Sequence, residues 1–108
     1  AGRSKYLIKS GGENIYPAEI ERVILADPRV ADAIVVRRAD DRWGEVPVAV
    51  IARTDVSLDA AAVEALCRAG LAGYKRPKDV VFLPIEDFPR NVSGKILREE
   101  IEKLVAKA

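Results

Sequence analysis

Two runs rich in valine and isoleucine, residues 30–38 and 46–52, place the strongest constraint on the fold of this chain. β-Branched side chains pack well on a pleated surface, so each run predicts a strand. The residues between them at 40–44, Asp-Asp-Arg-Trp-Gly, are typical of a turn. We therefore expect the two strands to pair as a hairpin with a longer connection.

Three segments carry apolar residues at helical spacing. The first runs from Pro17, which suits the first turn of a helix, to the Asp-Pro pair at 27–28. The second has Ser57 as its expected cap and ends near Gly70. The third is expected from about Lys95. The residues expected to face the core are Ile20, Val23 and Ile24 in the first helix, Ala62, Val63, Leu66 and Ala69 in the second, and Ile96, Leu97, Ile101, Leu104 and Val105 in the third.

Two shorter extended stretches complete the pattern. Residues 6–9 lead into the Ser-Gly-Gly run at 10–12, and a glycine pair marks a turn. Residues 80–83, bounded by Pro77 and Pro84, predict another strand. The sequence therefore predicts an α+β fold, in which a small sheet (a short N-terminal hairpin plus a three-stranded sheet) is flanked by about three helices.

Composition excludes several classes of function. The chain has 108 residues, one cysteine and no histidine, so a Ser-His-Asp or Cys-His mechanism within it is excluded, as is an internal disulfide. The formal net charge of +1 gives no bulk attraction to nucleic acid. No apolar run approaches the length of a membrane span, and no acidic metal cluster is visible. We expect no metal site, no nucleic-acid partner, no membrane span and a cytoplasmic location.

Three segments carry groups suited to binding or catalysis, and each also has a plainer structural interpretation. Lys95 follows Gly94 in a polar loop and can stabilise developing negative charge, although most lysines are only solvated. The glycines of residues 10–14 can expose N–H groups to an anion or simply form a tight turn. Residues 74–78, Tyr-Lys-Arg-Pro-Lys, can hold a nucleotide or form a solvated loop. Core positions are expected for Trp43 and Cys67.

Five segments occur in an order that is found in one enzyme family. They are Gly-Arg-Ser-Lys at 2–5, Ile-Lys-Ser-Gly-Gly-Glu-Asn-Ile-Tyr-Pro-Ala-Glu-Ile-Glu at 8–21, Trp-Gly-Glu at 43–45, Tyr-Lys-Arg-Pro at 74–77 and Pro-Arg-Asn-Val-Ser-Gly-Lys at 89–95. Over essentially its whole length the chain resembles the C-terminal domain of AMP-forming acyl-CoA synthetases, which are relatives of luciferases and of peptide-synthetase adenylation domains.

The resemblance implies a mobile lid domain of a larger acid-thiol ligase. Such enzymes convert a carboxylic acid and Mg-ATP to an acyl-adenylate and pyrophosphate, and then transfer the acyl group to coenzyme A. Residues 1–9 are expected to form a hinge or linker from a missing large N-terminal domain, and residues 10–108 the lid. ATP, Mg²⁺ and coenzyme A would be substrates of the full enzyme, none of them held by this fragment alone. The isolated fragment is expected to be inactive.

The resemblance also assigns roles to individual residues. The resemblance implies two catalytic residues: Lys95 matches the lysine that serves adenylation, and Lys9 belongs to the segment that swings in for thioester formation. Arg3 and Lys5 match the hinge, and Tyr6 stands where many members carry an acidic residue. The residues that match contacts to coenzyme A or its pantetheine arm are Ser10, Gly11, Gly12, Glu13, Tyr74, Arg76 and Lys78.

The alternative to a ligase domain is a non-catalytic module that binds coenzyme A or a carrier protein. The wording Gly-Gly-Glu-Asn-Ile-Tyr-Pro at 11–17 favours ligases of fatty-acyl, aryl or related small acids. The expected partners are therefore the N-terminal domain, a small carboxylic acid, ATP and coenzyme A. A carrier-protein phosphopantetheine is an alternative acyl acceptor, and the cations Arg76 and Lys78 weigh against it.

Overall fold

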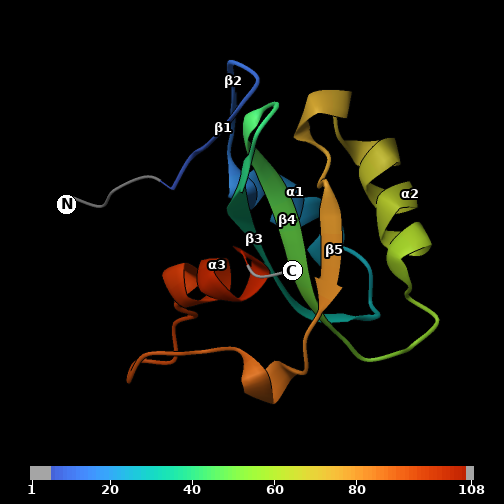
Figure 1. The fold of residues 1–108 in the computed structure, drawn as a ribbon. Coiled ribbons are helices and arrows are strands. Elements are labelled where there is room, and N and C mark those ends of the chain that lie inside the picture. The colour runs from blue at the N-terminus through green and yellow to red at the C-terminus, as the bar shows by residue number, and fades with distance from the viewer. Residues whose placement is uncertain (1–5, 107–108) are drawn as a thin grey trace.

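A five-stranded sheet organises the part of the chain that the computed structural model describes, residues 6–106 (Figure 1). Helices α1, α2 and α3 and two short 3₁₀ turns, η1 and η2, connect or follow the strands. In chain order the elements are β1 (Ile8–Ser10), β2 (Glu13–Ile15), α1 (Pro17–Leu25), β3 (Val30–Asp40), β4 (Gly44–Arg53), α2 (Ala60–Gly70), η1 (Gly73–Lys75), β5 (Asp79–Phe82), η2 (Ile85–Asp87) and α3 (Arg98–Ala106).

The long antiparallel hairpin of β3 and β4 forms the centre of the sheet and confirms the pairing expected from the two apolar runs. Its register extends from Val30 opposite Arg53 to Asp40 opposite Gly44. Strand β5 lies parallel to β4 on the other side. The short β1–β2 hairpin joins the same sheet where Ser10 pairs with Gly44. The α+β class is thus confirmed, with the N-terminal hairpin and the three-stranded part united in one sheet.

Both faces of the sheet are buried, because its central strands are apolar on both sides. Alternate residues such as Val35 and Ile51 pack under α1 and α2, whereas Val36 and Val50 pack under α3. Figure 1 shows α3 on the opposite side of the sheet from α1. Burying each such side chain contributes about 1.5–3 kcal/mol. The helical residues that complete the two cores are Ile20, Ile24, Val63, Cys67, Ile101 and Val105.

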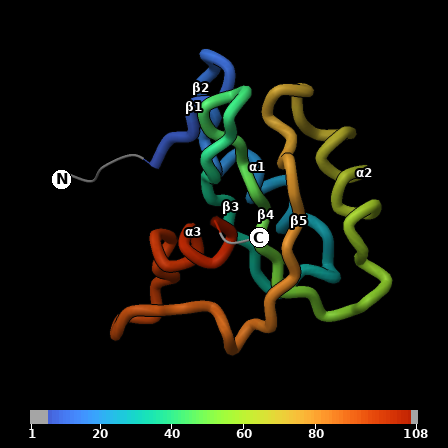
Figure 2. The backbone as a smooth tube through the Cα atoms, in the orientation of Figure 1, coloured from blue at the N-terminus to red at the C-terminus, as the bar shows by residue number. Residues whose placement is uncertain are grey.

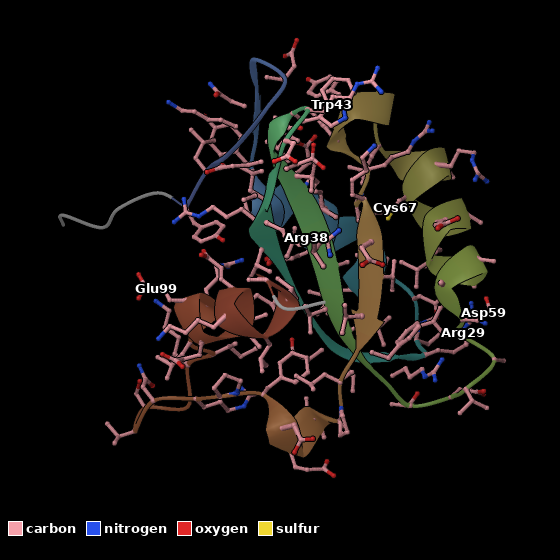
Figure 3. All side chains as sticks on the ribbon, in the orientation of Figure 1. Arg29, Arg38, Trp43, Asp59, Cys67 and Glu99 are labelled. Atoms are coloured by element: carbon pink, nitrogen blue, oxygen red, sulfur yellow. The ribbon has the colours of Figure 1, made fainter. Side chains whose placement is uncertain are left out.

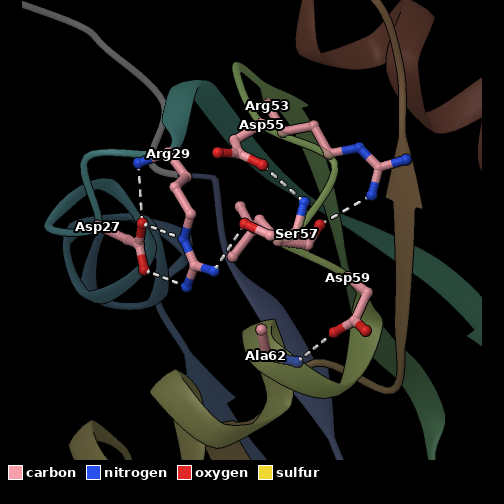
Figure 4. A network of polar contacts seen from close by, with 8 residues as sticks. Asp27, Arg29, Arg53, Asp55, Ser57, Asp59 and Ala62 are labelled. Atoms are coloured by element: carbon pink, nitrogen blue, oxygen red, sulfur yellow. Dashed lines mark hydrogen bonds and ion pairs between the residues drawn. The ribbon is translucent and has the colours of Figure 1, made fainter.

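The start of α2 differs from its prediction. Asp59, not Ser57, caps the helix, because its carboxylate accepts a hydrogen bond from the Ala62 N–H at 2.9 Å. Ser57 is held one turn earlier, where its N–H donates to Asp55 and its hydroxyl accepts from Arg29 (Figure 4). Ala69, near the end of the same helix, was predicted to face the core. That prediction is wrong, because Ala69 is exposed.

An ion pair fixes the entry into β3 and joins it to the loop before α2. The Arg29 guanidinium donates to both carboxylate oxygens of Asp27, at 3.0 and 2.9 Å, and reaches Ser57 from the other side (Figure 4). The Arg29 side chain holds the pKa of Asp27 at about 2, below its ordinary value of 3.8. Asp27 is therefore ionised throughout the physiological range.

Helix α3 begins at Arg98, later than the expected start near Lys95. The intervening residues are extended, because Ile96 forms a bridge with Arg90 and the Leu97 N–H donates to the Pro89 carbonyl at 2.8 Å. The predicted apolar stripe is correct for Ile101 and Val105, which are buried. It is wrong for Leu97 and Leu104, which are 37% and 53% exposed.

Candidate functional site

Lys95 lies on an exposed loop, residues 89–96, which we call the Lys95 loop. The loop leaves η2 and returns to α3, and its tip stands well away from the sheet (Figure 2). The Lys95 side chain is exposed and forms no ion pair within residues 6–106. Its ammonium group is thus presented outward as an unneutralised cation.

Asn91 gives this loop a defined conformation. Its side-chain oxygen accepts three hydrogen bonds, from the Ser93 N–H at 3.0 Å, the Ser93 hydroxyl at 2.8 Å and the Lys95 N–H at 3.0 Å. Its own N–H donates to the Lys95 carbonyl at 2.9 Å. Gly94 completes the turn with φ near 88°, in the region that favours glycine. The backbone of Lys95 is therefore fixed although its side chain is solvated.

Arg90 ties the Lys95 loop to the body of the domain. One guanidinium nitrogen donates to the Gly94 carbonyl at 2.9 Å, and the other donates to Asp32 of β3 at 3.2 Å. The ion pair with Asp32 is only partly exposed, at 36% for Arg90 and 30% for Asp32. Arg90 thus connects the turn of the Lys95 loop to β3.

A second group of candidate residues lies at the other end of the hairpin formed by β3 and β4. The β1–β2 turn, the β3–β4 turn and the η1 segment converge there around an open cavity of about 250 Å³, which we call the hairpin pocket. The pocket brings together residues 10–13 and 74–78, the two segments that the resemblance matches to contacts with coenzyme A. Its lining residues are Ser10, Gly11, Glu13, Trp43, Val46, Pro47, Gly73, Tyr74, Arg76 and Lys78.

Trp43 is part of this pocket, and its predicted place in the core is wrong. The indole is 40% exposed and stands between the β1–β2 turn and η1 (Figure 3). Asp40 orients the turn that carries it, because the Asp40 carboxylate accepts the N–H groups of Arg42 and Trp43, both at 2.9 Å. A tryptophan inside a short Asp-rich turn was the sequence signal for exposure.

Gly11 lets the β1–β2 turn lie directly against this indole. Its φ is near 56°, and its N–H donates to the Trp43 carbonyl at 2.8 Å. A Cβ at this position would lie 2.6 Å from Trp43 Cε3. Gly12 has φ near 85° and open space around it. The two positions therefore require glycine for different reasons. At Gly11 a side chain would collide with Trp43, whereas at Gly12 only the positive φ disfavours other residues.

The pocket is positively charged on its η1 side. Arg76 and Lys78 form no ion pair within the described residues, and the Lys78 ammonium lies 5.7 Å from the Trp43 ring centroid. Lys75 differs, because Glu19 accepts a hydrogen bond from it at 2.9 Å and raises the pKa of its ammonium. The pocket thus presents two free cations beside aromatic rings, a combination suited to a nucleotide carrying phosphates.

The remaining predicted site residues lie near these features or outside the described chain. Lys9 is exposed on β1 but does not line the pocket, and its N–H donates to Glu45 at 2.9 Å. Gly12 forms the adjoining turn. The expected hinge residues Arg3 and Lys5 lie outside the residues that the structure describes.

Two negative findings concern residues 6–106. No group of three or more His, Cys, Asp or Glu side chains is placed to hold a metal ion there. None of the helices described is long and apolar enough to cross a membrane. Cys67 lies on the buried face of α2, in the core as predicted, and burial raises the pKa of its thiol (Figure 3). Reactivity of this thiol is therefore suppressed in the fold.

Comparison with known proteins identifies the family. The family model for the AMP-binding enzyme C-terminal domain matches residues 19–95, and the chain belongs to this family. Among curated relatives, indoleacetate–CoA ligase of Aromatoleum aromaticum is 48% identical over 98% of the chain and 21% of its own length. A 2-succinylbenzoate–CoA ligase of Bacillus cereus is 50% identical over 95% of the chain and 21% of its own length.

Solved structures agree with the sequence matches. A fatty acyl CoA synthetase of Mycobacterium tuberculosis superimposes with a TM-score of 0.89 and 39% identity, covering 97% of this chain and 20% of that one. The chain therefore spans about a fifth of the length of the CoA ligases and synthetases that it matches. The resemblance drawn from its five motifs is confirmed at the level of the C-terminal domain of AMP-forming acid–CoA ligases.

Proposed function

We propose that this chain is the mobile lid of a longer ATP-dependent acid–CoA ligase, with residues 1–9 as its hinge segment and residues 10–108 as the lid. The lid would serve adenylation with the Lys95 loop and thioester formation with the hairpin pocket. The substrates would be a carboxylic acid, ATP with Mg²⁺, and coenzyme A. Relatives named for indoleacetate and 2-succinylbenzoate support a small organic acid as substrate class.

One observation carries this proposal, namely that the two candidate sites lie far apart on the domain. The β1–β2 hairpin and the tip of the Lys95 loop stand at different ends of it (Figure 2). A single orientation cannot bring both ends to one catalytic centre. Two half-reactions at one centre then require two orientations of the lid, each presenting one end.

The chemistry of each end suits its half-reaction. During adenylation a carboxylate approaches the α-phosphate of ATP, and a cation between the two anions offsets their repulsion and stabilises charge on phosphorus. Lys95 presents such a cation on a fixed backbone. During thioester formation the thiol arm of coenzyme A must reach the acyl-adenylate. The glycine turn of residues 11–12 offers a narrow path for that arm, while Tyr74, Arg76 and Lys78 hold the nucleotide.

The role of Lys95 is tested with Lys95→Ala in the full-length ligase, assaying the two half-reactions separately. Adenylation should slow by about 10²–10³-fold, the cost of removing one preorganised charge-stabilising group. Thioester formation from supplied acyl-adenylate should persist. Lys103→Ala is the matched control, because Lys103 is an exposed lysine on α3 whose one ion pair within residues 6–106 is with Glu100. Equal losses in both half-reactions would contradict the assigned role.

The alternative, a non-catalytic module that binds coenzyme A or a carrier protein, is distinguished by titration of the 108-residue chain with coenzyme A. A lid that needs its partner domain should bind at millimolar concentration or not at all. Micromolar binding favours the module. The free cations beside Tyr74 and Trp43 are the observation that keeps this alternative open.

A further inference from the structure

Tyr6, the first residue that the structure describes, is held by both of its polar neighbours. Its hydroxyl donates to the carboxylate of Glu102 on α3 and accepts the backbone N–H of Arg37 on β3 at 2.9 Å. Two guanidinium groups lie against its ring, with centroid distances of 4.7 Å to Arg37 and 4.9 Å to Arg98. A side chain that is held at its hydroxyl by two hydrogen bonds and contacted at its ring by two arginines has little freedom to move.

The groups around Tyr6 are themselves fixed. Arg98 donates to Glu21 of α1 at 2.9 Å and to the Val35 carbonyl at 2.6 Å. Glu21 accepts the Val35 N–H at 2.8 Å with the same oxygen. Arg37 pairs with Glu102 at 3.2 Å. The cluster therefore contains two arginines and two glutamates and links α1, β3 and α3 around one ring.

This cluster also completes the free edge of the sheet. β3 ends the strand order, so its outward backbone groups have no strand partner. Glu21 and Arg98 satisfy the N–H and C=O of Val35, and Tyr6 satisfies the N–H of Arg37. Burial and the Glu102 hydrogen bond raise the pKa of the Tyr6 hydroxyl, which stays neutral and able to make both of its hydrogen bonds.

Through Arg98, the cluster around Tyr6 is close in sequence to the base of the Lys95 loop. Arg98, whose guanidinium contacts the Tyr6 ring, is the first residue of α3 and follows directly on Leu97. The Leu97 N–H is bonded to the Pro89 carbonyl at the other end of the loop. A displacement of Tyr6 would therefore pass through Arg98 to the base of the loop that presents Lys95.

We propose that Tyr6 is a positioning residue that joins the segment after the hinge to α3, so that rotation of the lid carries the Lys95 loop with it as one rigid body. This inference rests on the proposed role of Lys95. Tyr6 contacts β3 and α3 directly, and Arg98 extends the cluster to α1 through Glu21. The cluster already has a carboxylate, that of Glu102 on α3. This accounts for a tyrosine at a position where many members of the family carry an acidic residue.

The first test is backbone amide exchange in the 108-residue chain carrying Tyr6→Phe. The Arg37 amide should exchange about fivefold faster or more, because it loses its acceptor. The Val35 amide, which is bonded to Glu21, is the internal control and should change less. Tyr16→Phe is the matched variant, since Tyr16 is 50% exposed and its hydroxyl makes no hydrogen bond within residues 6–106. An unchanged Arg37 amide overturns the anchor, whatever the function of the protein.

The second test uses the full-length ligase. Tyr6→Phe should lower kcat for adenylation about fivefold with little change in KM for ATP, because the lysine is misplaced while the ATP site is not. Glu102→Gln, which keeps an acceptor for the hydroxyl, should show a smaller loss. Faster Arg37 exchange with unchanged adenylation overturns the coupling to Lys95. If instead Lys95→Ala itself leaves adenylation intact, the proposed function fails while the exchange result still decides the anchor.

Discussion

The two glycines of the β1–β2 turn allow a quantitative prediction about the hairpin pocket. Gly11→Ala and Gly12→Ala both place a Cβ on a backbone with positive φ, near 56° and 85°. That conformation costs about 1–2 kcal/mol for an L-residue. Reduced freedom of the unfolded chain returns about 0.4–1 kcal/mol. Gly12→Ala, which meets nothing within 4 Å, should therefore destabilise the domain by about 1 kcal/mol in total.

Gly11→Ala carries an additional cost, because its Cβ would meet Trp43 Cε3 at 2.6 Å and Cζ3 at 2.9 Å. The indole has to swing away from the turn, at a cost of about 1–2 kcal/mol for overpacking. The total is about 2–3 kcal/mol, which corresponds to a fall in Tm of roughly 10–20 °C for a domain of this size. Gly12→Ala should lower Tm by only about 4–8 °C.

Thermal unfolding followed by circular dichroism measures the two shifts, and fluorescence reports on the indole. Trp43 is the only tryptophan in the chain, so its emission can be assigned without labelling. Gly11→Ala should shift the emission to longer wavelength, and Gly12→Ala should not. In a Trp43→Ala background the two alanine variants should have equal cost. Equal Tm shifts with the indole present, together with unchanged emission, would refute the contact between Gly11 and Trp43.

Two further predictions concern stability and loop order. Asp27→Asn should lower the free energy of unfolding at pH 6, because Arg29 depresses the pKa of Asp27 in the fold to about 2. The difference from wild type should shrink as the pH falls from 3.8 towards 2. Urea unfolding at several pH values measures this difference, with Asp41→Asn, at an exposed position, as the control. Asn91→Ala should speed amide exchange at Ser93 and Lys95, whereas Asn91→Asp, which keeps the acceptor, should preserve protection; equal exchange in both variants would contradict the role of the side-chain oxygen.

Local pattern was enough to predict the centre of the fold. The valine and isoleucine runs predicted the β3–β4 hairpin, because two runs of β-branched residues and the polar turn between them are all encoded within about twenty residues. The parallel pairing of β5 with β4 was not predictable in the same way, since it depends on contacts between distant segments. The cap of α2 was misplaced because Ser57 and Asp59 are both competent caps, and Arg29, distant in sequence, engages Ser57.

The candidate site shows the same division between local and distant information. Ordered motifs predicted Lys95 and the segments of the hairpin pocket, but local pattern alone gave no reason to join residues 10–13 with Tyr74. The joining residue is Trp43, which was assigned to the core because a large apolar ring usually lies there. Its exposure follows from the hydrogen bonds of Asp40, which hold the turn outside the sheet.

The Lys95 loop and the hairpin pocket are both well ordered, which favours rotation of the whole domain over movement of individual loops. The Lys95 loop is fixed by Asn91 and Arg90, and the β1–β2 turn is fixed by its contact with Trp43. Ordering a loop on docking would cost about 0.5–1.5 kcal/mol for each immobilised side chain. A lid whose ends are already ordered avoids most of that cost each time it changes orientation.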